Sequence, residues 1–221
     1  MNIDLKLNDC LDGLKQINHQ SIDAIITDPP YFCGMTHNGT KGTYSDLNMV
    51  KPFFKEVFKQ WKRVLKANGE IYVFCDWRTY PLFYELLQEV LTIRNRITWD
   101  KISGAGCYYS YSHEDIIFCT NPSPQYKRYK KGQNVWRMPA FSSGAKKTNG
   151  EKVHPTQKPI ELIEKLVLSA TENEGDTVLD CFAGSGTTAV ACKRLNRNFV
   201  GFEIQEKYYN IALERIKAVP S

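Results

Sequence analysis

The sequence of 221 residues lacks the features that define several large classes of protein. No stretch comes close to the roughly 18 consecutive apolar residues of a membrane-spanning helix, and the first residues contain no apolar secretory segment. The seven cysteines never occur in a C-x-x-C spacing, so neither a zinc site nor a disulfide framework is indicated. We therefore expect a cytoplasmic protein with reduced thiols, no membrane partner and no metal site.

Positive charge is also scarce over most of the chain. The net charge is +5, but residues 121–152 alone hold eight Lys and Arg residues and the single acid Glu151, so the remainder is slightly acidic. A local basic segment predicts a polyanionic partner on one face, although a solvated basic loop has the same composition. The residues expected to contact that partner are Lys127, Arg128, Lys130, Lys131, Arg137, Lys146 and Lys147.

Short β-branched runs alternate with amphipathic helical stretches, which predicts an α/β fold with a parallel sheet in a single domain, residues 1–221. The longest predicted helix carries an aromatic stripe that we expect in the core, and Asn68-Gly69 is expected to end it. Residues 121–153 fit neither pattern and read as an irregular basic insert. Strands are expected at 3–7, 22–27, 70–75, 96–99, 114–119, 177–180 and 198–203, and helices at 47–66, 81–91, 159–170, 186–195 and 206–218.

A glycine-rich turn follows the expected strand 177–180 and opens the next helix. Gly184 and Gly186 permit a tight turn and let the backbone approach a ligand closely. The following strand ends in Glu203, where a carboxylate can accept both hydroxyls of a ribose. The residue three positions after Gly186 is Ala189, so the full pyrophosphate fingerprint is not met. A nucleoside ligand without a pyrophosphate fits this pattern at least as well as a dinucleotide.

A second motif, Asp28-Pro29-Pro30-Tyr31, ends the apolar strand 22–27. The two prolines fix φ and hold the preceding carboxylate and carbonyl rigidly at the carboxyl edge of the sheet, where α/β proteins bind ligands. Tyr31 adds an aromatic face beside these acceptors. The combination is typical of a receptor for a planar heterocycle with an exocyclic amine.

These motifs resemble those of the amino-group DNA methyltransferases that use S-adenosylmethionine. The resemblance rests on Asp28-Pro29-Pro30-Tyr31, on residues 180–188 (Asp-Cys-Phe-Ala-Gly-Ser-Gly-Thr-Thr) and on residues 154–159 (His-Pro-Thr-Gln-Lys-Pro). Since the catalytic motif precedes the cofactor turn, the order is similar to that of the permuted β class. The resemblance implies a Rossmann-like fold, with a mostly parallel seven-stranded sheet and helices on both faces.

The resemblance also implies site residues. Asp9 is similar to an adenine-contacting residue, although a simple turn residue would look the same. Lys158 is similar to residues near the methionine end of the cofactor, although it could equally be a basic residue on the surface at a helix start. The implied catalytic residues are Asp28, Pro29, Pro30 and Tyr31. The implied cofactor-binding residues are Asp9, Cys10, Thr156, Lys158, Asp180, Phe182, Ala183, Gly184, Ser185, Gly186, Thr187 and Glu203.

The implied reaction is methylation of the N6 amine of an adenine flipped out of double-stranded DNA. Cytosine-N4 methylation and a non-catalytic DNA-binding protein on the same fold remain the alternatives. Residues 32–46 are expected to form a lid over the base, and the insert 121–153 a short target-recognition segment. Aromatic side chains at Tyr126, Tyr129, Trp136 and Phe141 could stack on DNA there. A homodimer and a cognate restriction enzyme are partners that the resemblance suggests and the sequence leaves open.

Overall fold

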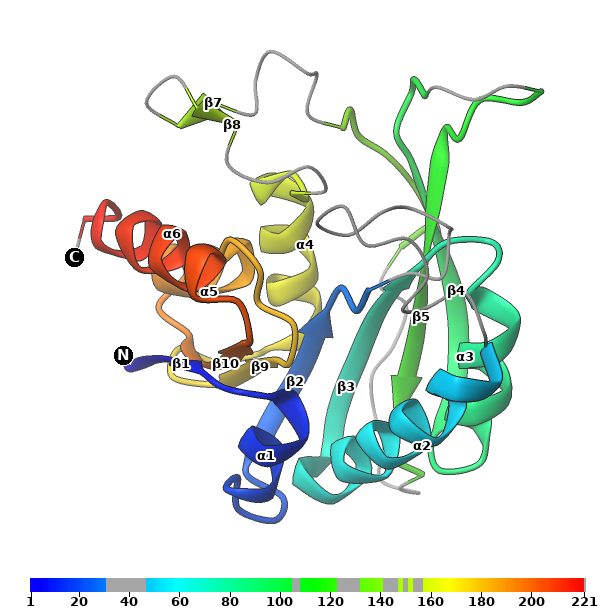
Figure 1. The fold of residues 1–221 in the computed structure, drawn as a ribbon, viewed down its shortest axis with the longest axis horizontal. Coiled ribbons are helices and arrows are strands. Elements are labelled where there is room, and N and C mark those ends of the chain that lie inside the picture. Colours follow the sequence, from blue (N-terminus) through cyan, green and yellow to red (C-terminus); the bar gives the residue numbers. More distant parts are fainter. Residues whose placement is uncertain are drawn as a thin grey trace.

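The computed structural model describes residues 1–30, 47–104, 108–122, 132–140, 147–148, 151–152 and 157–220, with the backbone alone for 47–49, 147–148 and 151–152. Its centre is an eight-stranded sheet (Figure 1). In spatial order the strands are β1 (Ile3–Leu7), β10 (Asn198–Glu203), β9 (Thr177–Asp180), β2 (Ile22–Thr27), β3 (Leu65–Cys75), β5 (His113–Thr120), β4 (Thr92–Asp100) and β6 (Val135–Arg137).

All neighbouring strands are parallel except at β5, which runs antiparallel to both β3 and β4. The predicted class, a mostly parallel α/β sheet, is therefore confirmed. The carboxyl ends of β1, β10, β9, β2 and β3 lie along one edge, which the start of β5 and the end of β4 extend. We call this the carboxyl edge.

Helices cover both faces of the sheet, as Figure 1 shows. One core cluster joins the sheet to α1 (Cys10–Lys15), α2 (Leu47–Val64) and α3 (Tyr80–Gln88). The other joins it to α4 (Ile160–Ala170), α5 (Thr187–Arg194) and α6 (Glu206–Lys217). A sheet covered on both faces explains why its central strands are apolar at almost every position.

The aromatic stripe of α2 lies in the core, as predicted. Phe54, Phe58 and Trp61 are fully buried, and the ring of Phe54 lies 4.8 Å from that of Phe83 in α3. The Trp61 indole N–H donates to the sulfur of Cys181, just after β9 (3.2 Å). The helix thus packs against the segment that carries the glycine turn.

Two predictions about the elements were wrong, and one helix was missed. The sheet has eight strands rather than seven, because β6 from the basic insert pairs with β4. Asn68-Gly69 does not end α2, since the helix stops at Val64 and both residues lie within β3. The helix α1 was not predicted, because it has only six residues and too little periodicity to detect.

A short antiparallel pair, β7 (Lys147–Thr148) and β8 (Glu151–Lys152), also lies in the insert.

Among the described residues, no helix is long and apolar enough to cross a membrane. The same residues contain no group of three or more His, Cys, Asp or Glu side chains that could hold a metal ion.

Candidate active site

The glycine turn is anchored by the carboxylate of Asp180 at the end of β9. Its Oδ1 accepts hydrogen bonds from the Thr27 hydroxyl (2.6 Å) and the Phe182 N–H (3.1 Å), and its Oδ2 accepts one from the Thr188 hydroxyl (2.7 Å). Burial raises the pKa of Asp180 to about 6, although these hydrogen bonds favour the charged form. Asp180 therefore holds the turn in place and links β9 to the end of β2.

Gly184 leaves open space beside the turn. Its φ is +52°, and a Cβ built there would find its nearest atom, the Phe182 carbonyl oxygen, 4.0 Å away. The Gly184 N–H donates to Glu203 Oε2 (2.9 Å), while Glu203 Oε1 accepts from the Gln205 N–H (2.7 Å). Burial raises the pKa of Glu203. Gly184 and Glu203 thus lie together, as predicted. The oriented carboxylate of Glu203 beside the open space at Gly184 fits a nucleoside.

Gly186 has a different reason to be glycine. Its φ is +77°, and a Cβ would lie 2.7 Å from the Cβ of Ala212 in α6. The same helix supports the turn through Arg215, whose guanidinium donates to the Ser185 carbonyl and hydroxyl and to the Thr187 hydroxyl. The close approach at Gly186 is therefore to a helix of the protein.

Asp9 caps α1 and lies next to this site. Its Oδ1 accepts from the Leu11 N–H (2.8 Å), and the neighbouring Asn8 N–H donates to the Glu203 carbonyl (3.0 Å). The Asp9 carboxylate is thus the cap of α1, and the hydrogen bond from Asn8 places this cap next to the end of β10. Cys10 is buried, and burial raises the pKa of its thiol to about 12. Its side chain is therefore a packing group.

Asp28 follows β2 and forms an ion pair that the sequence did not reveal. The Lys158 Nζ lies 2.6 Å from Asp28 Oδ2 and 3.1 Å from Glu114 Oε2 at the start of β5. Lys158 is only 6% exposed, so its alternative reading as a surface residue is wrong. Glu114 was missed, because an acid at the start of a strand carries no signal until the fold brings it to Asp28.

The pKa shifts agree with this geometry. Burial disfavours the charged form of Lys158, but Asp28 and Glu114 outweigh it and raise the pKa of Lys158 above its ordinary value. Burial likewise opposes ionisation of Glu114, yet Lys158 and Lys101 hold its pKa below the ordinary value. Lys158 and Glu114 are therefore both charged at neutral pH.

Exposed aromatic side chains gather at the same carboxyl edge. Trp77 follows β3, and Tyr108, Tyr109 and Tyr111 precede β5; they are between 51% and 97% exposed. The guanidinium of Arg78 lies 5.3 Å from the Trp77 ring and 5.8 Å from the Tyr111 ring. Such a surface can stack on planar groups.

Several predicted site residues lie outside the described residues. These are Tyr31, the lid 32–46, Thr156, Lys127, Arg128, Lys130, Lys131 and Lys146, together with Tyr126, Tyr129 and Phe141 of the insert. Lys147 lies in β7, where the backbone alone is described.

Two further residues of the insert belong to β6. Arg137 is exposed, and its Nε lies 3.5 Å from Asp100 Oδ2. Trp136 is buried in the core cluster of α4 to α6, and its indole N–H donates to the Gln133 carbonyl. The expectation that Trp136 stacks on DNA is therefore wrong, because its ring is used to attach β6 to the core.

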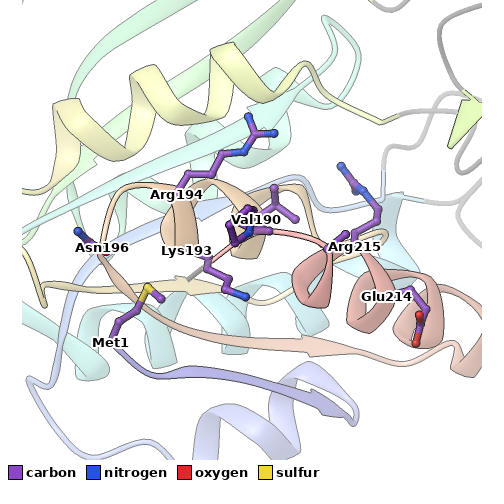
Figure 2. A pocket seen from close by; sticks show the side chains of 10 residues that line it. Met1, Val190, Lys193, Arg194, Asn196, Glu214 and Arg215 are labelled. Atoms are coloured by element: carbon purple, nitrogen blue, oxygen red, sulfur yellow. The ribbon is translucent and has the colours of Figure 1, made fainter.

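A pocket of about 700 Å³ lies elsewhere, between α5, α6 and the first residue of the chain (Figure 2). Lys193 and Arg194 of α5 and Glu214 and Arg215 of α6 line it. None of the predicted site residues does. We place the active site at the carboxyl edge instead, because the chemically active side chains converge there.

Comparisons with known proteins identify the family of the chain. The family model of the N6/N4-type DNA methylases matches residues 22–214. The Type II methyltransferase M.HpaI of Haemophilus parainfluenzae is 35% identical, over 95% of this chain and 72% of its own length. The Type II methyltransferase M2.DpnII of Streptococcus pneumoniae is 32% identical, over 96% of this chain and 88% of its own length.

Solved structures show the same fold. The complex of M1.HpyAVI with S-adenosylmethionine is 27% identical with a TM-score of 0.73, and the match covers 97% of this chain and 98% of that one. The cytosine-N4-specific PvuII DNA methyltransferase has a TM-score of 0.78 at 17% identity, covering all of this chain and 89% of that one, a likeness of fold alone. The match over residues 22–214 and the similarity to two Type II methyltransferases along most of their length show that this chain belongs to the S-adenosylmethionine-dependent N6/N4 DNA methylase family.

Proposed function

We propose that this protein transfers a methyl group from S-adenosylmethionine to the N6 amine of an adenine flipped out of double-stranded DNA. The observation that carries the proposal is the single hydrogen bond from Thr27 to Asp180. It joins Thr27, the last residue of β2 and the neighbour of Asp28, to the residue that anchors the glycine turn, so acceptor and cofactor residues share one edge of the sheet. That arrangement suits a transfer between two bound planar molecules.

The cofactor residues at this edge fit a nucleoside. Glu203 is held by two backbone N–H groups, which orients its carboxylate toward ribose hydroxyls, and Gly184 adds a surface without a side chain. Asp9 is close to the same region, because the N–H of its neighbour Asn8 donates to the Glu203 carbonyl. Bound there, S-adenosylmethionine would supply an electrophilic methyl group on a positively charged sulfur.

Asp28 and Pro29 act on the acceptor amine. An adenine amine is a poor nucleophile, because its lone pair is delocalised into the ring. The Asp28 carboxylate and the Pro29 carbonyl can accept its two hydrogens and favour the tetrahedral form. As the N–C bond forms, the S–C bond would break with its electron pair returning to the sulfur, which would leave as a neutral thioether. The amine also loses one proton, for which Asp28 is the carboxylate in reach. Tyr31 would stack on the base.

The DNA-binding surface combines two features. The exposed side chains of Trp77, Tyr108, Tyr109 and Tyr111 lie at the same edge as Asp28 and can stack on bases. The basic insert 121–153 adds Lys and Arg residues that can contact phosphates. We place the duplex across this edge, with the insert as a short recognition segment, and leave a second subunit and a restriction enzyme as partners to be tested.

Cytosine-N4 methylation would use the same geometry. We prefer adenine because, in the family that the motifs resemble, the aspartate form of the motif usually accompanies adenine, whereas serine at the position of Asp28 is more often found with cytosine. The deciding experiment is transfer of labelled methyl from S-adenosylmethionine to duplex DNA, followed by digestion and identification of the modified nucleoside. N6-methyladenine is expected, and it should disappear in Asp28→Ala. N4-methylcytosine would correct the base and keep the chemistry.

Two controls make the result interpretable. Glu203→Gln should weaken S-adenosylmethionine binding by about tenfold or more, because it removes the charge that accepts the ribose hydroxyls, whereas Glu206→Gln on the exposed start of α6 should not. If S-adenosylmethionine binds but no DNA is methylated, the protein is a DNA-binding member of the fold without activity.

A further inference from the structure

Lys158 forms a buried ionic cluster with two carboxylates from different strands. Its Nζ contacts Asp28 Oδ2 at 2.6 Å and Glu114 Oε2 at 3.1 Å. Its third neighbour is the Phe74 ring of β3, with the centroid 5.0 Å away. A lysine 6% exposed and so surrounded has little freedom to move.

Burying this charged cluster costs desolvation free energy, which argues for a functional role. Removing an ammonium group from water costs several kcal/mol unless close partners compensate. A chain that needed only a folded sheet edge could use apolar side chains at these positions. Here Lys158 comes from the segment before α4, Asp28 from the end of β2 and Glu114 from β5. Two distant segments, the one before α4 and the start of β5, are thus fixed relative to Asp28.

We propose that Lys158 and Glu114 are positioning residues for the methyl transfer, with Lys158 orienting the Asp28 carboxylate through Oδ2 and Glu114 holding Lys158 in place. This inference rests on the proposed function and refines it. It replaces the expectation that Lys158 contacts the cofactor with a role behind the acceptor-binding carboxylate.

The physical reason is that Asp28 can accept an amine hydrogen only while it is ionised and correctly turned. With Oδ2 bound by Lys158, the orientation of the carboxylate is fixed at the end of β2. Acidic and thiol groups lie around this cluster. The negative charge of Asp28 is among those that act on Cys75, together with Asp115, Asp76 and Glu114, and it also acts on Asp180 of β9. Lys101 is bound to Glu114 (3.3 Å).

Substitutions of Lys158 and Glu114 should change the pH profile of kcat in different ways. Lys158→Met leaves two carboxylates without their shared cation, so the pKa of Asp28 should rise and the acid limb of the kcat profile should move up by about one pH unit or more. In Glu114→Gln the amide oxygen can still accept from Lys158, but the neutral amide holds the ammonium group less firmly, so kcat should fall by about tenfold. Because one negative charge near Asp28 is gone, the acid limb of the kcat profile should not move up.

The matched control is Glu70→Gln. Glu70 is a buried carboxylate (2% exposed) in the middle of β3, away from the carboxyl edge, where it accepts from the Tyr72 hydroxyl. If the effect of Glu114→Gln came merely from changing a buried carboxylate, Glu70→Gln would show it too. We expect Glu70→Gln to leave the pH profile of kcat unchanged. Lys158→Arg keeps the positive charge and should return the acid limb to its wild-type position.

A measurement that needs no turnover separates this inference from the proposed function. The Asp28 carboxyl carbon, labelled with ¹³C and identified by its loss in Asp28→Asn, is titrated by NMR in the wild type, Lys158→Met and Glu114→Gln. We expect a higher midpoint in Lys158→Met alone. An unchanged midpoint, or a loss of S-adenosylmethionine affinity without a change in midpoint, would overturn the positioning role even if the wild type methylates DNA. If the wild type does not methylate DNA, the proposed function fails and the titration still tests the cluster.

Discussion

The hydroxyl of Thr27 donates a 2.6 Å hydrogen bond to the buried carboxylate of Asp180, across the boundary between β2 and β9. Both groups are at most 4% exposed. This contact joins the two motifs of the proposed site, because Asp28 follows Thr27 directly and the glycine turn follows Asp180.

Removing this hydrogen bond should affect both stability and binding. Thr27→Val is nearly isosteric and leaves the Asp180 carboxylate with one donor fewer, so we expect a loss of about 1–3 kcal/mol in the free energy of unfolding. S-Adenosylmethionine affinity should also fall, which a calorimetric titration would measure. Thr98→Val, which removes a hydroxyl donor from Asp115 (3.1 Å), is the control and should leave cofactor affinity unchanged. Equal cofactor affinity in the two variants would contradict the link.

The two glycines of the turn should respond differently to the same substitution. Gly186→Ala places a methyl group 2.7 Å from the Cβ of Ala212, so steric overlap of about 1–3 kcal/mol adds to the left-handed backbone strain. Gly184→Ala carries the strain without the overlap, and its methyl group would enter the open space beside Glu203. Urea denaturation should therefore show the larger loss for Gly186→Ala, and ligand titration the larger loss of affinity for Gly184→Ala.

Asp180 should make stability depend on pH in a specific direction. Burial raises its pKa from the ordinary 3.8 to about 6, so the folded state binds this proton more tightly than the unfolded chain does. Its contribution to stability is fully present below about pH 4 and is lost as the pH rises through about 6. Comparing the wild type with Asp180→Asn, the difference in unfolding free energy should change by up to about 3 kcal/mol across this range. A flat difference would show that the carboxylate titrates normally.

Trp77 offers a direct optical test of the DNA-binding edge. Of the four tryptophans in the chain, Trp77 is 59% exposed, while Trp61, Trp99 and Trp136 are at most 7% exposed. Duplex DNA should quench the emission from Trp77 by stacking or by displacing water from the ring. Trp77→Phe should abolish the change. Quenching that persists in this variant would place the duplex elsewhere.

The basic insert predicts a sequence-independent contribution to DNA affinity. Lys130→Gln with Lys131→Gln should weaken binding to all duplexes and reduce the slope of log K against log salt by about 2, because two phosphate contacts are lost. Lys59→Gln with Lys62→Gln, on the exposed side of α2, is the control with the same change in charge. Fluorescence anisotropy at several salt concentrations measures the slope. An unchanged slope would indicate that the insert is a solvated loop.

The sequence alone determined the parts of this protein that depend on neighbours along the chain. The apolar strands, the amphipathic helices, the glycine turn after Asp180 and the Asp-Pro-Pro-Tyr motif are local patterns, and they predicted the class of fold and the family. The strand limits of β1, β2, β9 and β10 agree with the predicted ranges, because short apolar runs with clear ends are the easiest pattern to read.

Only the tertiary structure decided which of these residues meet. Lys158 and Glu114 are 44 positions apart and lie far along the chain from Asp28, so no spacing rule connects them. Trp136 looked like an exposed stacking residue, and only the pairing of β6 with β4 showed that it is buried. The reason is physical: the energy of an ion pair or a buried ring depends on groups that folding brings together, and a sequence pattern reports only on the groups beside it.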